Sequence, residues 1–179
     1  MEKKLSEMSL EELWKLFPIY LTEHQPYWKE WYTDEESFLK NRVPKIERIS
    51  HIGSTAINSI YAKPIIDILV EISKDYCLSD YKEVIVKSGY TCMSETSDRL
   101  SFNKGYTEEG FAERVFHLHL RYIGDNDELY FRFSTVWHNH LRNKHLTEHL
   151  RNNSNELATV RFSAFCGAML SNNSFLMQR

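Results

Sequence analysis

Residues 63–72 read KPIIDILVEI, an apolar run rich in β-branched residues that is interrupted near its centre by Asp67 and carries a second acid, Glu71, beside its end. Such a run is typical of a central strand that is buried on both faces. Residues 45–52 alternate more loosely between apolar and polar side chains, which predicts a half-buried strand that ends at Gly53 and Ser54. The two segments therefore predict a sheet in which a glycine turn and a buried acid belong to successive strands.

Helical patterns precede and follow this pair of strands. A capping box formed by Ser9 and Glu12 predicts a short helix that ends near Pro18, and Pro26 opens a second helix. The buried face of the second helix is expected to comprise Trp28, Trp31, Phe38 and Leu39. Residues 75–90 predict a third helix.

Two more strands are predicted at residues 100–102 and 114–123. The glycine-containing, acidic segment between them, residues 104–113, is interpreted as a mobile loop. A helical pattern runs over residues 129–141, and the Asn- and Ser-rich residues 151–179 form an atypical tail. This order of elements predicts an α+β fold of α/β type, a small mixed sheet flanked by helices.

The composition fits one cytoplasmic domain that spans residues 1–179. With 22 Lys and Arg against 25 Asp and Glu, the formal net charge of −3 provides no broad basic field for nucleic acid. The three cysteines are scattered, which argues against a disulfide framework or a thiolate zinc site and favours a reducing compartment. No signal peptide is predicted, and no apolar run approaches the roughly 20 residues that a membrane span needs.

The first candidate site combines the turn at Gly53, Ser54 and Thr55 with Asp67, which follows Ser54 after twelve intervening residues. A glycine lets the backbone approach a phosphate, hydroxyls bind its oxygens, and a carboxylate holds Mg²⁺ or Mn²⁺ between phosphate and protein. The alternative is a plain turn with an N-capping hydroxyl. Asp67 needs a partner, either Lys63 or a bound metal or substrate, because an unpaired carboxylate in an apolar strand is costly.

The second candidate site is the pair His117 and His119, which strand periodicity places on one face. Neutral imidazoles at this spacing are typical metal ligands and suit transition metals such as Zn²⁺ or Ni²⁺ better than Mg²⁺. The alternative is the ordinary polar face of a half-solvated sheet. Proximity to Asp67 is expected to decide between the two.

Basic side chains supply candidate phosphate contacts. Lys63 and Arg121 are assigned to phosphate binding, and a guanidinium is well suited to this role because it donates to two oxygens at once. Arg132 and Arg142 are further candidates of the same kind, and the alternative for all three arginines is an ordinary solvated surface position. His145 and His149 have helical spacing but are interpreted as a polar helix face, because a closed zinc site needs four ligands.

Three blocks in this order resemble the GrpB family: HIGSTAI at residues 51–57, AKPIIDI at 62–68 and FHLH at 116–119. The similarity extends over about residues 20–141. The resemblance implies a nucleotidyltransferase-like fold, in which a Gly-Ser turn binds phosphate and acids on the following strands bind metal. It places Gly53 and Ser54 at the phosphate turn and Asp67 at the first metal acid. Leu69 would occupy the position of the second acid, and one of the strand histidines that of the third.

Three functional hypotheses follow. The first is a metal-dependent nucleotidyltransferase-like enzyme that binds a nucleotide or another phosphate-bearing small molecule, with Asp67 as its catalytic acid and with Asp67, His117 and His119 as metal ligands. The second is a non-catalytic nucleotide- or cofactor-binding module, favoured by Leu69. The third is a transition-metal-dependent hydrolase that uses the two histidines with Asp67.

Overall fold

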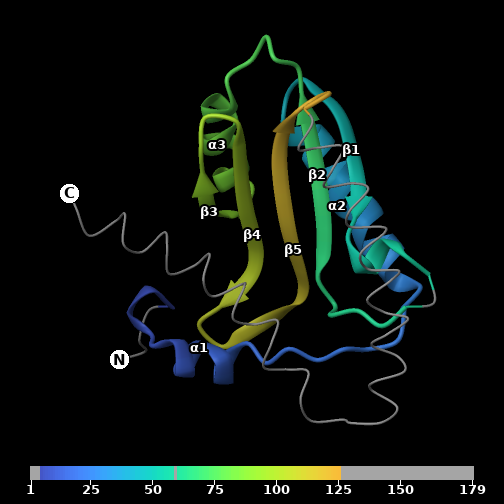
Figure 1. The fold of residues 1–179 in the computed structure, drawn as a ribbon, viewed down its shortest axis with the longest axis vertical. Helices are drawn as coiled ribbons and strands as arrows, with labels where there is room; N and C mark the ends of the chain where they lie inside the picture. Colours follow the sequence, from blue (N-terminus) through green and yellow to red (C-terminus); the bar gives the residue numbers. More distant parts are fainter. Residues whose placement is uncertain (1–4, 59, 126–179) are drawn as a thin grey trace.

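The computed structural model describes residues 5–58 and 60–125. These residues form several short helices, one long helix and five strands, whose arrangement is shown in Figure 1. In chain order they are η1 (Leu5–Glu7), α1 (Leu10–Leu16), α2 (Tyr27–Arg42), β1 (Ile46–Ile52), η2 (Ser54–Ala56), β2 (Ile66–Ile72), α3 (Leu78–Lys87), β3 (Thr91–Glu95), β4 (Arg99–Thr107) and β5 (Gly110–Tyr122).

The described strands form one sheet in the order β1-β2-β5-β4-β3. Strands β2 and β5 run parallel at its centre, whereas the other neighbours are antiparallel. The α+β class and the small mixed sheet expected from the sequence are therefore confirmed.

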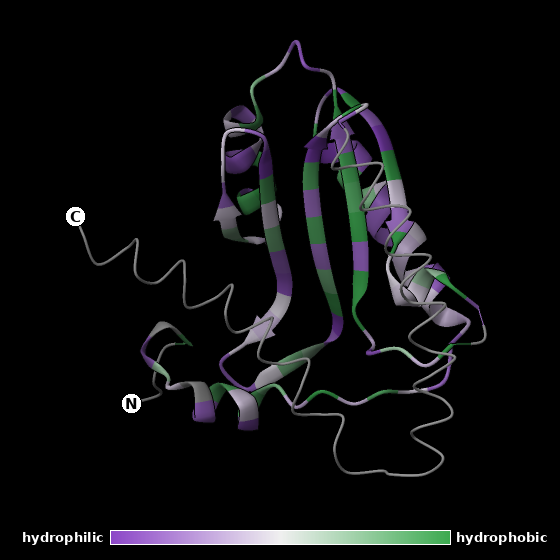
Figure 2. Ribbon diagram, in the orientation of Figure 1, coloured by the Kyte–Doolittle hydropathy of each residue, from purple (hydrophilic) through white to green (hydrophobic). Residues whose placement is uncertain are grey.

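The apolar face of the sheet is covered by α2 and α3. Strand β2 is buried along nearly its whole length, as its apolar sequence predicts. Every second residue of β2 and β5 points to the helices, where Trp28 and Leu39 of α2 and Ile85 of α3 are fully buried. The alternation between hydrophobic and hydrophilic residues along β5 is visible in Figure 2.

The opposite face of the sheet is largely polar, and we call it the polar face. Pairing places its side chains in three rows across β1, β2, β5 and β4. The rows are Ile52, Asp67, His117 and Asn103; Ser50, Leu69, His119 and Ser101; and Arg48, Glu71, Arg121 and Arg99. The two candidate sites of the sequence therefore meet in the first two rows.

The predicted starts of the first two helices, α1 and α2, are confirmed. At α1, the Glu12 N–H donates to Ser9 Oγ at 3.3 Å and the Ser9 N–H donates to Glu12 Oε2 at 2.6 Å, so the capping box is formed. The helix ends at Leu16, two residues before Pro18. Pro26 caps α2, and the third predicted helix appears as α3.

The interpretation of residues 104–113 as a mobile loop is wrong. These residues form the tip of a β-hairpin, in which Thr107 pairs with Gly110. The glycines permit the hairpin: Gly105 has φ 91°, and a Cβ there would lie 2.4 Å from the carbonyl oxygen of Arg114. Strand β3 was not predicted from the sequence, and Lys63 lies before β2 rather than on it.

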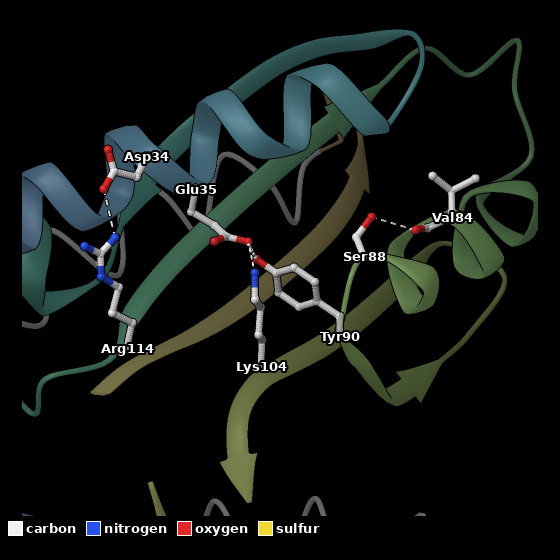
Figure 3. A network of polar contacts seen from close by, with 7 residues as sticks. All are labelled: Asp34, Glu35, Val84, Ser88, Tyr90, Lys104 and Arg114. Carbon is white, nitrogen blue, oxygen red and sulfur yellow. Dashed lines mark hydrogen bonds and ion pairs between the residues drawn. The ribbon is translucent and has the colours of Figure 1, made fainter. Parts of the chain in front are cut away.

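A polar cluster joins α2 to β4 through the apolar side of the sheet (Figure 3). Glu35 is buried, and its Oε1 accepts hydrogen bonds from Tyr90 Oη at 2.9 Å and from Lys104 Nζ at 2.7 Å. The Lys104 ammonium also lies 4.4 Å from the ring centroid of Phe38. This cluster therefore satisfies a buried carboxylate and fixes α2 against the sheet.

The helix predicted over residues 129–141, the tail over 151–179 and the histidines and arginines beyond residue 125 lie outside the described residues. Among the helices that the structure does describe, none is both long enough and apolar enough to span a membrane.

Candidate functional site

The carboxylate of Asp67 packs directly against Gly53. Antiparallel pairing sets Ile52, the last residue of β1, opposite Asp67, so the chain turns away at Gly53 beside that carboxylate. Gly53 has φ 76°, and a Cβ built on it would lie 2.3 Å from Asp67 Oδ2. Only glycine allows both this backbone conformation and this approach.

The turn after Gly53 is η2, and Thr55 anchors it. The Thr55 hydroxyl is buried, donates to the carbonyl oxygen of Ile65 at 3.2 Å and lies 3.0 Å from His51 Nε2. Ser54 is half-buried, and its hydroxyl makes no hydrogen bond within residues 5–58 and 60–125. Of the two hydroxyls assigned to phosphate, Thr55 is committed to the fold and Ser54 is available to a ligand.

Both strand histidines converge on Asp67, as expected if the two candidate sites are one. His117 Nδ1 lies 3.3 Å and His119 Nε2 4.0 Å from Asp67 Oδ1. Burial raises the pKa of Asp67, but the neighbouring His117 and His119 side chains and the charge of Lys63 outweigh burial and lower the pKa below its usual range. Asp67 is therefore ionised at neutral pH.

His117 links Asp67 to a tyrosine that the sequence did not single out. Its Nε2 lies 2.8 Å from the Tyr106 hydroxyl, and the two rings stack with centroids 5.9 Å apart. Burial lowers the pKa of His117 despite the neighbouring carboxylate, so the ring is neutral at neutral pH. We assign its proton to Nδ1, facing Asp67, which leaves Nε2 to accept from Tyr106.

The described residues do not form a three-ligand metal centre. No three His, Cys, Asp or Glu side chains in residues 5–58 and 60–125 are arranged to hold one ion. A transition-metal site would need such a set. A Mg²⁺ or Mn²⁺ ion that is also coordinated by the phosphate oxygens of a bound ligand needs only one or two protein carboxylates, and Asp67 could supply one of them.

The other acid of β2 on the polar face is already paired. Glu71 is fully buried and forms a two-pronged ion pair with Arg48 of β1. Leu69, at the position of the second acid in the family resemblance, is also fully buried. Strand β2 therefore presents one carboxylate, Asp67, that is not paired with a guanidinium.

The two predicted phosphate-binding cations lie at different distances from Asp67. Lys63 precedes β2 and contributes to lowering the Asp67 pKa, so it lies within electrostatic range. Arg121 is four residues beyond His117 on β5, about 13 Å along the strand. Its Nη1 donates to the carbonyl oxygens of Leu100 and Leu120 at 2.8 and 2.7 Å. The structure therefore brings Lys63 to the site but not Arg121.

The family model described as GrpB protein matches residues 18–156 of this chain, which include every residue of the site. UPF0157 protein YqkA of Bacillus subtilis is 35% identical over 94 residues, which amount to 52% of this chain and 26% of that protein. The chain thus matches about a quarter of the length of YqkA. Glutamate-rich protein GrpB of Alkalihalophilus pseudofirmus is 31% identical over 120 residues, 64% of this chain and 69% of that protein.

A solved structure has the same fold. The crystal structure of conserved protein GrpB from Enterococcus faecalis aligns with a TM-score of 0.56 over 89% of this chain and 100% of that chain. The sequence identity is 23%, so the similarity concerns the fold alone.

Proposed function

We propose, since this chain belongs to the GrpB family, that its polar face binds a nucleotide or another phosphate-bearing small molecule together with one divalent cation. The main support for this proposal is the close packing of Gly53 against the Asp67 carboxylate. A phosphate bound at the turn would lie beside an ionised carboxylate, and two anions so close need a cation between them. Mg²⁺ or Mn²⁺ would supply that charge.

Three side chains around the turn support phosphate binding. The Ser54 hydroxyl makes no hydrogen bond within the described residues and is able to donate to a phosphate oxygen. Lys63 contributes positive charge near Asp67. His119, with Nε2 4.0 Å from Asp67 Oδ1, lies close enough to serve as a phosphate contact or a cation ligand. His119 is also proposed as a metal ligand, and so is His117, although an ion on His117 Nε2 would have to displace the Tyr106 hydroxyl that lies 2.8 Å from it.

Two classes of function use such a site. A nucleotidyltransferase-like enzyme would position a phosphate for transfer to an acceptor, with Asp67 holding the cation that neutralises the developing charge. A non-catalytic binding module would hold the ligand without transfer. The binding module is favoured by one observation: beyond Asp67, the polar face of β2 offers only Leu69 and the Glu71 carboxylate that is paired with Arg48. This leaves too little negative charge for two-metal chemistry.

The transition-metal hydrolase is a third proposal, carried by the convergence of two imidazoles on Asp67. It requires a further ligand from outside residues 5–58 and 60–125, because no three-ligand group occurs within them. Elemental analysis of the purified protein tests it: stoichiometric Zn²⁺ or Ni²⁺ supports a hydrolase, and a metal-free protein that retains phosphate binding contradicts it.

A thermal-stability screen tests the main proposal, because a ligand that binds only the folded protein raises its stability by mass action. The probes are nucleoside triphosphates, tripolyphosphate and inorganic phosphate, each with and without MgCl2 or MnCl2. We expect a stabilisation that needs phosphate and metal together and that weakens in Ser54→Ala. No shift with any combination would contradict the proposal.

A further inference from the structure

An apolar recess lies at the end of the sheet where β2 begins. Its volume is about 120 Å³. It is lined by the segment before α2, the approach to β2 and the start of β5, mainly by apolar and aromatic residues: Pro18, Ile19, Tyr20, Pro64, Ile65, Phe111 and Val115. Lys63 and Glu113 add opposite charges to this lining.

The recess opens on the same face of the sheet as Asp67. Val115 precedes His117 by two residues in β5, so strand periodicity points both side chains to the face of Asp67. Ile65, the residue before β2, lines the same recess as Val115. Two residues of strand separate the rows by about 6.6 Å. The recess and the phosphate turn are therefore neighbours on one surface.

The Lys63 side chain contributes positive charge to both the recess and the Asp67 site. Lys63 lines the recess, and its charge also acts on Asp67 and on His117. A ligand that spans from the turn to the recess would thus carry negative charge at one end, near Lys63, and an apolar group at the other.

We propose that the recess holds the planar base of a nucleotide whose phosphates bind at Gly53, Ser54 and Asp67. This inference rests on the proposed function and narrows its ligand from any phosphate-bearing molecule to a nucleotide. The spacing of one strand row leaves room for the sugar that separates a base from its phosphates. Inorganic phosphate has no apolar group that could occupy the recess.

Tyr20 is the side chain best placed to stack on such a base. It is 66% exposed, although it stands on the rim of the recess among prolines and isoleucine. Aromatic side chains stack on bases without regard to sequence, because every base has a π-face. Since so little of Tyr20 is buried, its removal should leave the fold intact.

The test compares ligands with and without a base. The probes are ATP, GTP, CTP, UTP and tripolyphosphate, each titrated calorimetrically with MgCl2 into the parent, Tyr20→Ala and Tyr20→Phe. Tyr76→Ala is the matched control, because Tyr76 is an exposed tyrosine beyond the other end of β2. We expect at least one nucleotide to bind more tightly than tripolyphosphate. Its affinity should fall about tenfold in Tyr20→Ala, and should be kept in Tyr20→Phe and Tyr76→Ala.

The possible results distinguish a failure of the base site from a failure of phosphate binding itself. If tripolyphosphate binds with Mg²⁺ as tightly as every nucleotide, or if Tyr20→Ala weakens tripolyphosphate as much as the nucleotides, the base site is contradicted and phosphate binding stands. If neither tripolyphosphate nor any nucleotide binds the parent, both proposals are overturned.

Discussion

The Oδ2 atom of Asp67 occupies the space that a side chain at position 53 would need, with 2.3 Å between that oxygen and an ideal Cβ. This contact joins the end of β1 to the acid of β2, so the turn at Gly53 and the carboxylate form one unit. It also explains why the acid is tolerated in an apolar strand: one oxygen lies against the turn and the other faces two imidazoles.

Gly53→Ala should destabilise the protein for two separable reasons. The positive φ alone costs roughly 1–2 kcal/mol for a residue with a Cβ, and the clash with Asp67 adds to it. Urea denaturation of Gly53→Ala, Asp67→Ala and the double variant measures the coupling. We expect Gly53→Ala to cost less in the Asp67→Ala background, and equal costs in both backgrounds would contradict the contact.

His51 should make the fold sensitive to acid. Burial lowers its pKa to about 4, although Asp67 acts in the opposite direction. Below about pH 6.5 the His51 imidazole is protonated in the unfolded chain but stays neutral in the folded protein. The free energy of unfolding therefore decreases as the pH falls from about 6.5 to about 4. Stability measured against pH should therefore fall less steeply in His51→Gln than in the parent. Parallel curves for the two proteins would show that His51 is not buried as described.

Removing only one partner of the Glu35–Lys104 ion pair should lower the free energy of unfolding. Lys104→Met would remove the ammonium from a buried carboxylate, which we expect to cost on the order of 2 kcal/mol, reduced from the value for fully buried pairs because Lys104 is partly exposed. Glu35→Gln combined with Lys104→Met should recover part of this loss. The matched control is Lys87→Met, whose ion pair with Glu83 is exposed and should contribute little. Equal effects of the two lysine substitutions would contradict the role of the cluster.

Asp67 should determine which nitrogen of His117 carries the proton, because an ionised carboxylate can only accept from Nδ1–H. With Nε2 accepting from the Tyr106 hydroxyl, the neutral ring is protonated at Nδ1. ¹⁵N chemical shifts of the imidazole report this tautomer directly. We expect the Nδ1–H form in the parent and in Tyr106→Phe, and a mixture of tautomers in Asp67→Ala. An Nε2–H form in the parent would reverse the assignment.

Local sequence patterns predicted the elements that position the site. The apolar run of β2 and the capping box of α1 depend on neighbouring residues, and both appear as predicted. Strand periodicity likewise placed His117 and His119 on one face, and the structure shows that this is the face of Asp67. Their roles as ligands remain predictions.

Features that depend on contacts distant in the sequence were missed. Gly105 and the acidic residues near it suggested a loop, because the sequence does not reveal that a bulge there is compensated by pairing with β5. Tyr106 lay within that supposed loop, so its contact with His117 was not foreseen. The pairing of Glu71 with Arg48 and the remoteness of Arg121 from Asp67 likewise follow from register, which strand composition does not specify.

Calorimetric titration of tripolyphosphate with MgCl2 into the parent and Asp67→Asn tests the central claim most directly, that the Asp67 carboxylate and the Gly53 turn form a cation-dependent phosphate site. The amide keeps the shape of the side chain and removes its charge. Asp80→Asn is the control, because Asp80 is an exposed acid on α3. We expect Mg²⁺-dependent binding in the parent and in Asp80→Asn, and its loss in Asp67→Asn with the fold retained. Equal Mg²⁺-dependent binding by the parent and Asp67→Asn would contradict the claim.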